Sequence, residues 1–149
     1  MKPTKKKGRR SKPRAVAAAT FPLSPCDCRA RNAFHKFLVK TLTPVLNVGF
    51  SFTIPPDTRA VIELVTARIL VPAGELARLR LVTALGSQGS NLDLTVSPQG
   101  VVNGKQILVA THSIRAYTDG LLDVVVNRDN DTTTGTATVC ISGYLEPLT

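Results

Sequence analysis

The side chains in this chain best suited to binding chemistry are basic residues gathered at the N-terminus. Eight of the 19 Lys and Arg residues lie within residues 1–14, and no acidic residue precedes Asp27. They are Lys2, Lys5, Lys6, Lys7, Arg9, Arg10, Lys12 and Arg14. Such side chains bind phosphate through charge, and no aromatic residue lies among them to stack on a nucleobase. We therefore expect residues 1–14, the basic arm, to bind a polyanion without reading its sequence, although a solvated tail or a nuclear-localisation signal has similar composition.

The rest of the chain is almost neutral. Outside the basic arm, 11 basic and 10 acidic side chains remain, so the formal net charge of +9 is an arm of +8 joined to a body of +1. The arm has almost no apolar side chains and contains Pro3, Gly8 and Pro13, so we expect it to be disordered alone. Residues 15–33 are Ala- and Pro-containing and are expected to be a linker that orders only in an assembly.

Three cysteines and two histidines are the other groups with ligand chemistry. Cys26 and Cys28 form a C-x-C pair, and Cys140 lies in a late predicted strand. An odd number of cysteines does not imply a closed disulfide framework. We expect reduced thiols, with a disulfide from Cys140 to the C-x-C pair as the alternative. His35 and His112 are isolated in sequence, so no metal-ligand spacing is present.

A polar loop late in the chain carries oxygen ligands. Asp129 and Asp131 flank Asn130, and carboxylate oxygens suit Ca²⁺, but the loop lacks the spacing of an EF-hand. We therefore expect a solvated turn and no cofactor, with these two aspartates as a calcium alternative. Asn130 also begins a glycosylation sequon, which matters only in a eukaryotic secretory pathway.

Catalytic motifs are missing from the sequence. The chain has no G-x-S-x-G, and the glycines at 86–89 lack the Lys-Ser/Thr and helix of a phosphate-binding loop. His112 and Ser113 are neighbours on a predicted strand, so their side chains point to opposite faces. We predict that the protein is not an enzyme. No stretch approaches the length of a membrane span, and the N-terminus lacks the apolar core of a secretion signal.

Short strands separated by Pro and Gly turns are predicted from residue 34 onwards. The segments are 34–42, 45–54, 59–71, 76–85, 92–96, 106–117, 121–127 and 136–144. Segment 34–42 also fits a short helix, segment 106–117 is expected to bend near His112, and 118–120 has the composition of a hairpin turn. We read 86–91 and 97–100 as loops. About eight strands with no long helix predict an all-β, antiparallel, jelly-roll-like β-sandwich over residues 34–149.

A basic arm, a short Ala/Pro linker and a domain of about eight strands resemble the coat proteins of small icosahedral viruses. The resemblance covers the layout of the whole chain, and it implies a single jelly roll whose arm faces the packaged genome. The eight basic residues of the arm would then neutralise the phosphates of nucleic acid, in the first place single-stranded RNA. The resemblance further implies a homo-oligomeric shell, a location in the virion and no membrane.

A second similarity points to other proteins. The run from Ile54 to Glu63 and the ending Ile141–Leu145 look like uncharacterised bacterial β-sandwich proteins. Two alternatives to a coat protein follow. One is an accessory protein that decorates a shell already built from a major capsid protein, and the other is a bacterial binding module.

Overall fold

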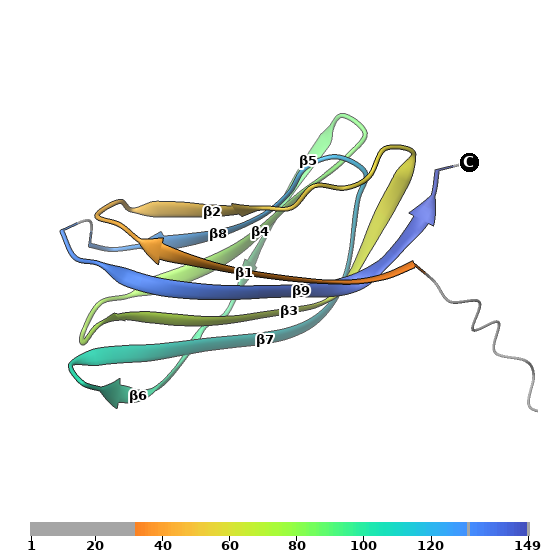
Figure 1. The fold of residues 1–149 in the computed structure, drawn as a ribbon. Coiled ribbons are helices and arrows are strands. Elements are labelled where there is room, and N and C mark those ends of the chain that lie inside the picture. Colours follow the sequence, from red (N-terminus) through yellow and green to blue (C-terminus); the bar gives the residue numbers. More distant parts are fainter. Residues whose placement is uncertain (1–31, 131, 149) are drawn as a thin grey trace, which may run out of the picture.

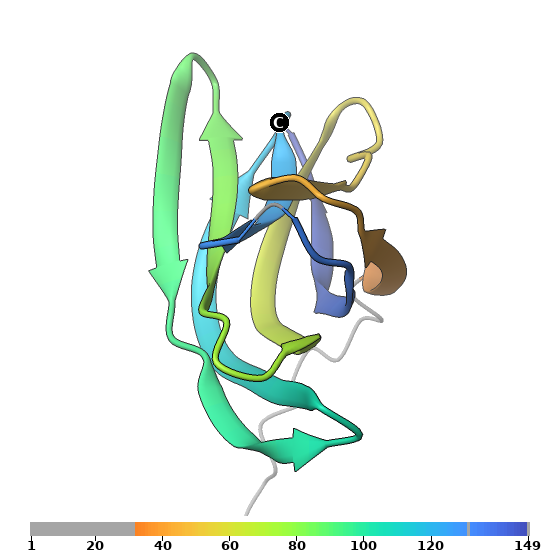
Figure 2. The ribbon, with the colours of Figure 1, turned by 90° about the vertical axis from the view of Figure 1, so that its left-hand side faces the viewer.

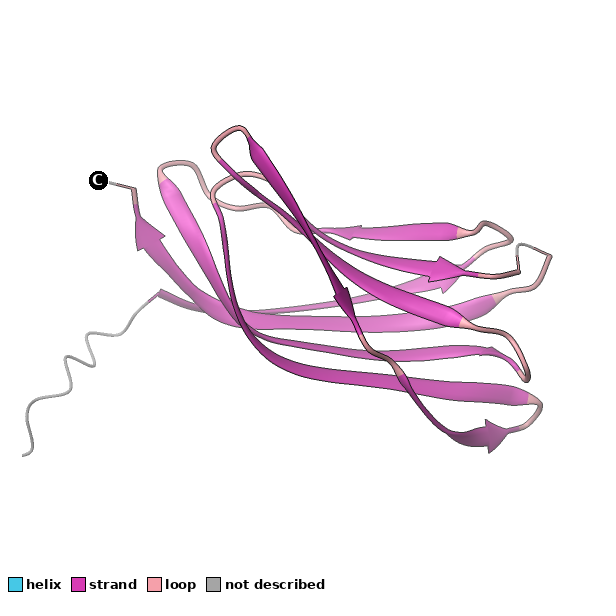
Figure 3. Ribbon diagram, turned by 180° about the vertical axis from the view of Figure 1, so that it is seen from behind, coloured by secondary structure: helices cyan, strands magenta, loops and turns pink. Residues whose placement is uncertain are grey.

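Alternation of apolar and polar side chains produces strands throughout the part of the chain that the computed structural model describes, residues 32–130 and 132–148 (Figure 3). The strands are β1 (Asn32–Leu42), β2 (Asn47–Ser51), β3 (Thr58–Pro72), β4 (Ala77–Leu85), β5 (Gln88–Leu94), β6 (Ser97–Val102), β7 (Lys105–Thr118), β8 (Leu122–Arg128) and β9 (Gly135–Pro147). Segment 34–42, which also fitted a helix, is therefore a strand. It begins at Asn32, two residues before the predicted start.

The strands form two antiparallel sheets that face each other (Figure 1). Sheet A has the order β1-β9-β3-β7-β6, and sheet B has the order β2-β8-β4-β5. The hydrogen-bonded pairs are nested along the chain: β4 pairs with β5, β3 with β7, β2 with β8, and β1 with β9. A ribbon of nested pairs wound into two sheets is a jelly roll, with β6 added at one edge. The predicted antiparallel, jelly-roll-like sandwich is confirmed.

The core fills the space between the sheets. In the long central strand β3, Val65, Ala67, Ile69 and Val71 point inward and are buried, as period-two alternation requires. The largest fully buried side chains come from both sheets: Leu42, Phe50, Ile62, Ile69, Leu79, Leu81, Leu122 and Ile141. One continuous apolar core therefore holds the two sheets together.

Two segments predicted as loops are strands. Residues 88–91 extend the predicted segment 92–96 at its start and belong to β5, and 97–100 belong to β6, the one strand beyond the expected eight. Both strands lie at sheet edges, and residues 88–91 and all of β6 are exposed, so these residues lack the alternation that marks a half-buried strand. Pro98 is accommodated because β6 is an edge strand with a register shift between Pro98 and Gly100.

The segment 118–120 does not form the predicted hairpin. It connects β7 in sheet A to β8 in sheet B, and these two strands do not pair. Thr118 donates its hydroxyl to the carbonyl of Ala84 at 2.8 Å, and Asp119 accepts the N–H of Gly86 at 2.9 Å. The turn is therefore held by contacts with the β4–β5 hairpin, which stands at one side of the sandwich in Figure 2.

Sheet A contains a bulge at Glu63. Between Ile62 and Leu64, β3 has one residue more than its neighbour β9, where Gly143 and Ser142 are consecutive. Opposite the same point β7 has one residue more than β3, next to the bend expected near His112. At this place the backbones approach so closely that a Cβ on Gly143 would lie 1.9 Å from the carbonyl oxygen of Val61.

Candidate functional site

The basic arm lies outside the described residues. The assignment of Lys2, Lys5, Lys6, Lys7, Arg9, Arg10, Lys12 and Arg14 to nucleic-acid binding therefore stays a prediction, as does the role of the linker up to residue 31. The described chain begins at Asn32, which pairs with Leu145 near the end of β9. The arm and linker thus join the sandwich at an edge strand of sheet A, at the end of the molecule that also carries the C-terminus (Figure 1).

The outer face of sheet A is nearly free of charge. Its side chains form four cross-strand rows running from β1 through β9 and β3 to β7. The rows are His35, Ser142, Leu64, Ser113; Phe37, Cys140, Thr66, Thr111; Val39, Thr138, Arg68, Val109; and Thr41, Thr136, Leu70, Ile107. Among these sixteen residues, Arg68 is the only one with a charged side chain. Phe37 and Val39 are 59% and 53% exposed, so a sizeable apolar strip lies open at the edge of this face.

The outer face of sheet B has a different chemistry. Arg78 and Arg80 of β4 project from it together with Asp93 of β5 and Asp123 of β8, and Asn47 and Asn127 lie side by side at its end. Arg80 donates to Asp93 in an exposed ion pair of 2.7 Å. Four charged side chains therefore lie on the outer face of sheet B, whereas the four rows of sheet A contain Arg68 alone, and those rows are the part of the surface suited to protein contacts.

The ion pair between Arg80 and Asp93 on sheet B leads to a testable prediction about the pKa of Asp93. The hydrogen bond from Arg80 lowers the pKa of Asp93, and the charges of Arg80 and Arg78 act in the same direction. We expect nuclear magnetic resonance titration of the Asp93 carboxyl to give a pKa below the ordinary Asp value, and Arg80→Met to raise it. Because the pKa is lowered by folding, the pair stabilises the protein above the Asp titration range and loses its effect as the pH falls. An unchanged Asp93 pKa in Arg80→Met would contradict this account.

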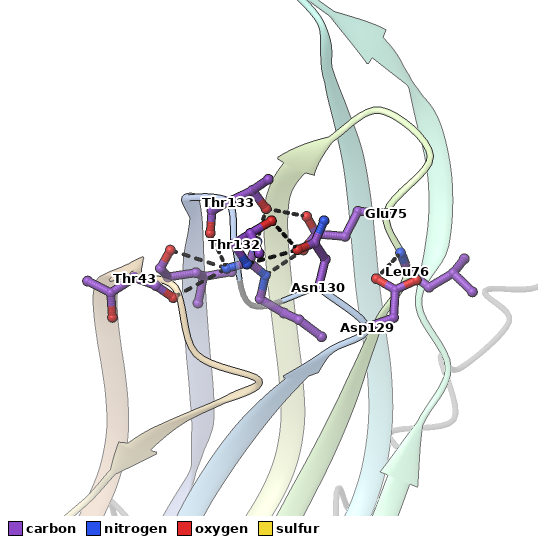
Figure 4. A network of polar contacts seen from close by, with 9 residues as sticks. Thr43, Glu75, Leu76, Asp129, Asn130, Thr132 and Thr133 are labelled. Atoms are coloured by element: carbon purple, nitrogen blue, oxygen red, sulfur yellow. Dashed lines mark hydrogen bonds and ion pairs between the residues drawn. The ribbon is translucent and has the colours of Figure 1, made fainter.

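A buried polar cluster lies at the end of the sandwich opposite the start of β1 (Figure 4). The side chains of Arg128 and Glu75 are 0% and 2% exposed and are joined at 2.5 Å. Thr133 completes the cluster: its hydroxyl donates to Glu75 and accepts from Arg128, each at 2.7 Å. Arg128 also donates to the carbonyls of Thr133, Leu42 and Thr43. This cluster, the arginine clasp below, ties together the β1–β2, β3–β4 and β8–β9 connections.

The aspartates suggested for calcium lie beside the arginine clasp. Asp129 accepts the N–H of Leu76 at 2.9 Å, and Asn130 accepts both the N–H and the hydroxyl of Thr132, so these side chains stabilise the loop itself. Asp131 lies outside the described residues. No group of three or more His, Cys, Asp and Glu side chains that could hold a metal occurs within residues 32–130 and 132–148. The calcium site stays a prediction without structural support.

His35 and Cys140 meet on the outer face of sheet A. The Nε2 atom of His35 lies 3.1 Å from the Sγ atom of Cys140, and its Nδ1 atom lies 2.7 Å from the hydroxyl of Ser142. Cys140 is a free thiol and is partly exposed. Sequence reasoning treated His35 as isolated because the pair is 105 residues apart, and only the pairing of the first strand with the last brings it together. His112 lies elsewhere, with Nε2 2.7 Å from the carbonyl oxygen of Thr95.

A cavity of about 540 Å³ lies between the β4–β5 hairpin and β7. It is lined by Leu81, Thr83, Leu85, Gln88, Gly89, Ser90, Leu92, Arg115, Ala116 and Tyr117. This lining contains no carboxylate, imidazole or thiol, so it has no group with an ordinary pKa near neutrality for acid–base catalysis.

Comparison with known proteins gives no family for this chain. It matches no protein-family model, and no curated protein matches it in sequence. No helix among the described residues is long and apolar enough to cross a membrane.

Proposed function

We propose that this protein is a viral coat protein that assembles with copies of itself into a shell, and that its basic arm holds the packaged nucleic acid. The observation that carries the proposal is the division of charge: an arm of +8 joined to a body of +1. A globular domain needs no such arm for its own stability, because like charges repel and gain nothing from burial. Single-stranded RNA is the proposed nucleic acid, bound through phosphate alone.

The surface of the sandwich supports the self-assembly part of the proposal. Shell formation requires protein contacts, and the four rows on the outer face of sheet A, in which Arg68 is the one charged residue, offer them. Large apolar side chains are also exposed on both edge strands of that sheet, namely Phe37 and Val39 on β1 and Val101 and Val102 on β6. Contacts at these edges would bury apolar area and cover unpaired strand backbone.

The proposal assigns no catalytic role. Glu75 and Arg128 serve the arginine clasp, and the lining of the cavity beside β7 contains no carboxylate, imidazole or thiol. The proposed activity is binding and assembly, and the proposed location is the virion.

Salt dependence of RNA binding tests the role of the arm. Fluorescence anisotropy with a single-stranded RNA should give a plot of log K against log salt with a slope of about −5 to −6, since each of eight phosphate contacts contributes about −0.7. Lys5→Gln, Lys6→Gln, Lys7→Gln and Arg9→Gln combined should roughly halve that slope. A chain lacking residues 1–14 should bind weakly with a slope near zero, and RNAs of different sequence should bind alike.

Two outcomes would count against this role. A slope that does not change when residues 1–14 are removed would place the contacts on the sandwich and contradict the proposal. Binding to preformed shells of another protein, with no affinity for RNA, would favour the accessory role instead.

A further inference from the structure

We propose that the cavity between the β4–β5 hairpin and β7 binds one nucleotide of the single-stranded RNA, with the base on the ring of Tyr117 and the phosphate at Arg115. The inference rests on the proposed coat function and extends it. In that proposal the basic arm binds RNA through phosphate alone, and the sandwich has no contact with a base. The cavity would add one such contact.

The lining of the cavity combines the kinds of group that hold a nucleotide. Its volume of about 540 Å³ lies within the range of about 300–1,000 Å³ that is usual for small-molecule sites. Three leucines and Tyr117 form apolar wall, and Thr83, Gln88 and Ser90 offer hydrogen-bonding groups. Arg115 brings a positive charge that no carboxylate of the lining opposes. A planar ring joined to a single anionic group fits this combination.

Tyr117 and Arg115 present an aromatic ring and a cation side by side. The guanidinium carbon of Arg115 lies 6.0 Å from the centroid of the Tyr117 ring, which is within cation–π range. Interactions with Tyr117 and Tyr144 raise the pKa of Arg115 and keep it charged. Within the described part of the chain, no Asp or Glu forms an ion pair with Arg115. Tyr117 is 37% exposed whereas Tyr144 is buried, so Tyr117 is the ring on which a base can stack.

The cavity lies at the end of sheet A where the arm and linker join the sandwich. Tyr117 of β7 pairs with Val61 of β3. Val61 pairs with Tyr144 of β9, which pairs with Ala33, the second residue of β1. This row spans three strand spacings of about 4.8 Å, so Tyr117 lies about 14 Å from Ala33. Attachment of the arm so close to the cavity raises the effective concentration of its RNA there.

Stacking on Tyr117 strengthens binding without reading a sequence. Every base has a π-face, so RNAs of different sequence should still bind alike. Arg115 adds one phosphate contact, which contributes about −0.7 to the slope of log K against log salt. The basic arm therefore remains the main source of the salt dependence, and the cavity contributes affinity that salt affects little.

Crosslinking and affinity measurements on the full-length protein test the site. A short single-stranded RNA carrying a photoreactive uridine, irradiated in complex with the native chain, should crosslink to Tyr117, as identified by mass spectrometry. In fluorescence anisotropy, Tyr117→Ala should weaken the affinity for a short RNA by about 5- to 150-fold, the effect of losing one stacked base. Tyr117→Phe should keep the affinity, because the ring stacks and the hydroxyl does not. Arg115→Gln should make the salt slope less steep by about 0.7.

Phe37→Ala is the matched control, because Phe37 is also an exposed aromatic residue of sheet A but lies on the edge strand β1. It should keep the native affinity. The crosslink requires no substitution, so it decides the case even if Tyr117→Ala loses its circular dichroism spectrum.

Three results would overturn the site, and they differ in what they leave standing. Native affinity in Tyr117→Ala, or crosslinks in the native chain that spare Tyr117, would remove the cavity site and leave the coat proposal intact. Binding of adenosine monophosphate that the short RNA does not displace would assign the cavity to a free nucleotide. A native full-length chain that binds no RNA at any salt concentration would remove both the site and the proposed function.

Discussion

Gly143→Ala should destabilise the sandwich by at least about 3 kcal/mol in denaturant-induced unfolding, the upper end of the range for overpacking a tightly packed site. The added Cβ would lie 1.9 Å from the carbonyl oxygen of Val61 and 3.0 Å from its carbonyl carbon. Neither is the end of a flexible side chain, so β3 and β9 must separate beside the bulge at Glu63. Because both strands are central in sheet A, the separation also disturbs their pairing and the core beneath them.

Gly49→Ala is the control for this substitution. Gly49 also lies in a strand, β2, but a Cβ there meets no atom within 4 Å. We expect its free energy of unfolding to stay within about 0.5 kcal/mol of the native value. Equal stability of the two variants would show that β3 and β9 are not in close contact at Gly143, and the register of sheet A would then be wrong.

Arg128→Met should cost about 3–5 kcal/mol, because it leaves the Glu75 carboxylate buried without its ion partner. The carbonyls of Thr133, Leu42 and Thr43 lose a donor at the same time. The three connections joined by the arginine clasp should then exchange their amide hydrogens faster than the rest of the sandwich. Thermal unfolding and hydrogen exchange together measure both effects.

A double variant separates the loss of the ion pair from the loss of packing. Glu75→Leu combined with Arg128→Met removes both charges, so it should be more stable than Arg128→Met alone. Arg80→Met is the matched control, since Arg80 pairs with Asp93 on an exposed face, and its melting temperature should hardly change. A melting temperature equally lowered in Arg80→Met and Arg128→Met would contradict the buried clasp.

The fold was predictable wherever one face of a strand is buried. In β9, residues 135–142 alternate between buried and partly exposed, and inward residues such as Ala137, Val139 and Ile141 could be assigned from the sequence, whereas β3 was recognisable as a central strand from its β-branched, apolar composition. The edge strand β6 and residues 88–91 of β5 were missed because a segment exposed on both faces has no hydrophobic period, and their Gly and Pro residues are typical of loops. The connection at 118–120 was read as a hairpin because its composition does not reveal that the chain changes sheets.

The candidate sites also differ in whether the sequence alone could reveal them. The basic arm could be recognised from sequence because its eight charges lie within 14 residues that contain no acidic residue. The arginine clasp and the His35–Cys140 pair could not, because each joins residues from distant parts of the chain. These residues come together because the strand pairs are nested. The nesting places β1 against β9 and the β3–β4 turn against the end of β8.

The fold alone does not choose among functions. Jelly rolls occur in viral capsids, lectins and cupins, so the strand order fits several roles. The coat-protein proposal depends on what is added to the fold: the arm of +8, its attachment at an edge of sheet A, and the four outer rows of that sheet with Arg68 as their one charged residue. A lectin or cupin role would use a ligand site on the sandwich and would not require the arm.

Electron microscopy of negatively stained, purified full-length protein with single-stranded RNA tests the central claim most directly, beside a chain lacking residues 1–14. We expect closed shells of uniform size containing nucleic acid from the full-length protein. The shortened chain should form empty or smaller shells, or none. A full-length protein that stays monomeric at high concentration across a range of salt, with and without RNA, would contradict the coat-protein account.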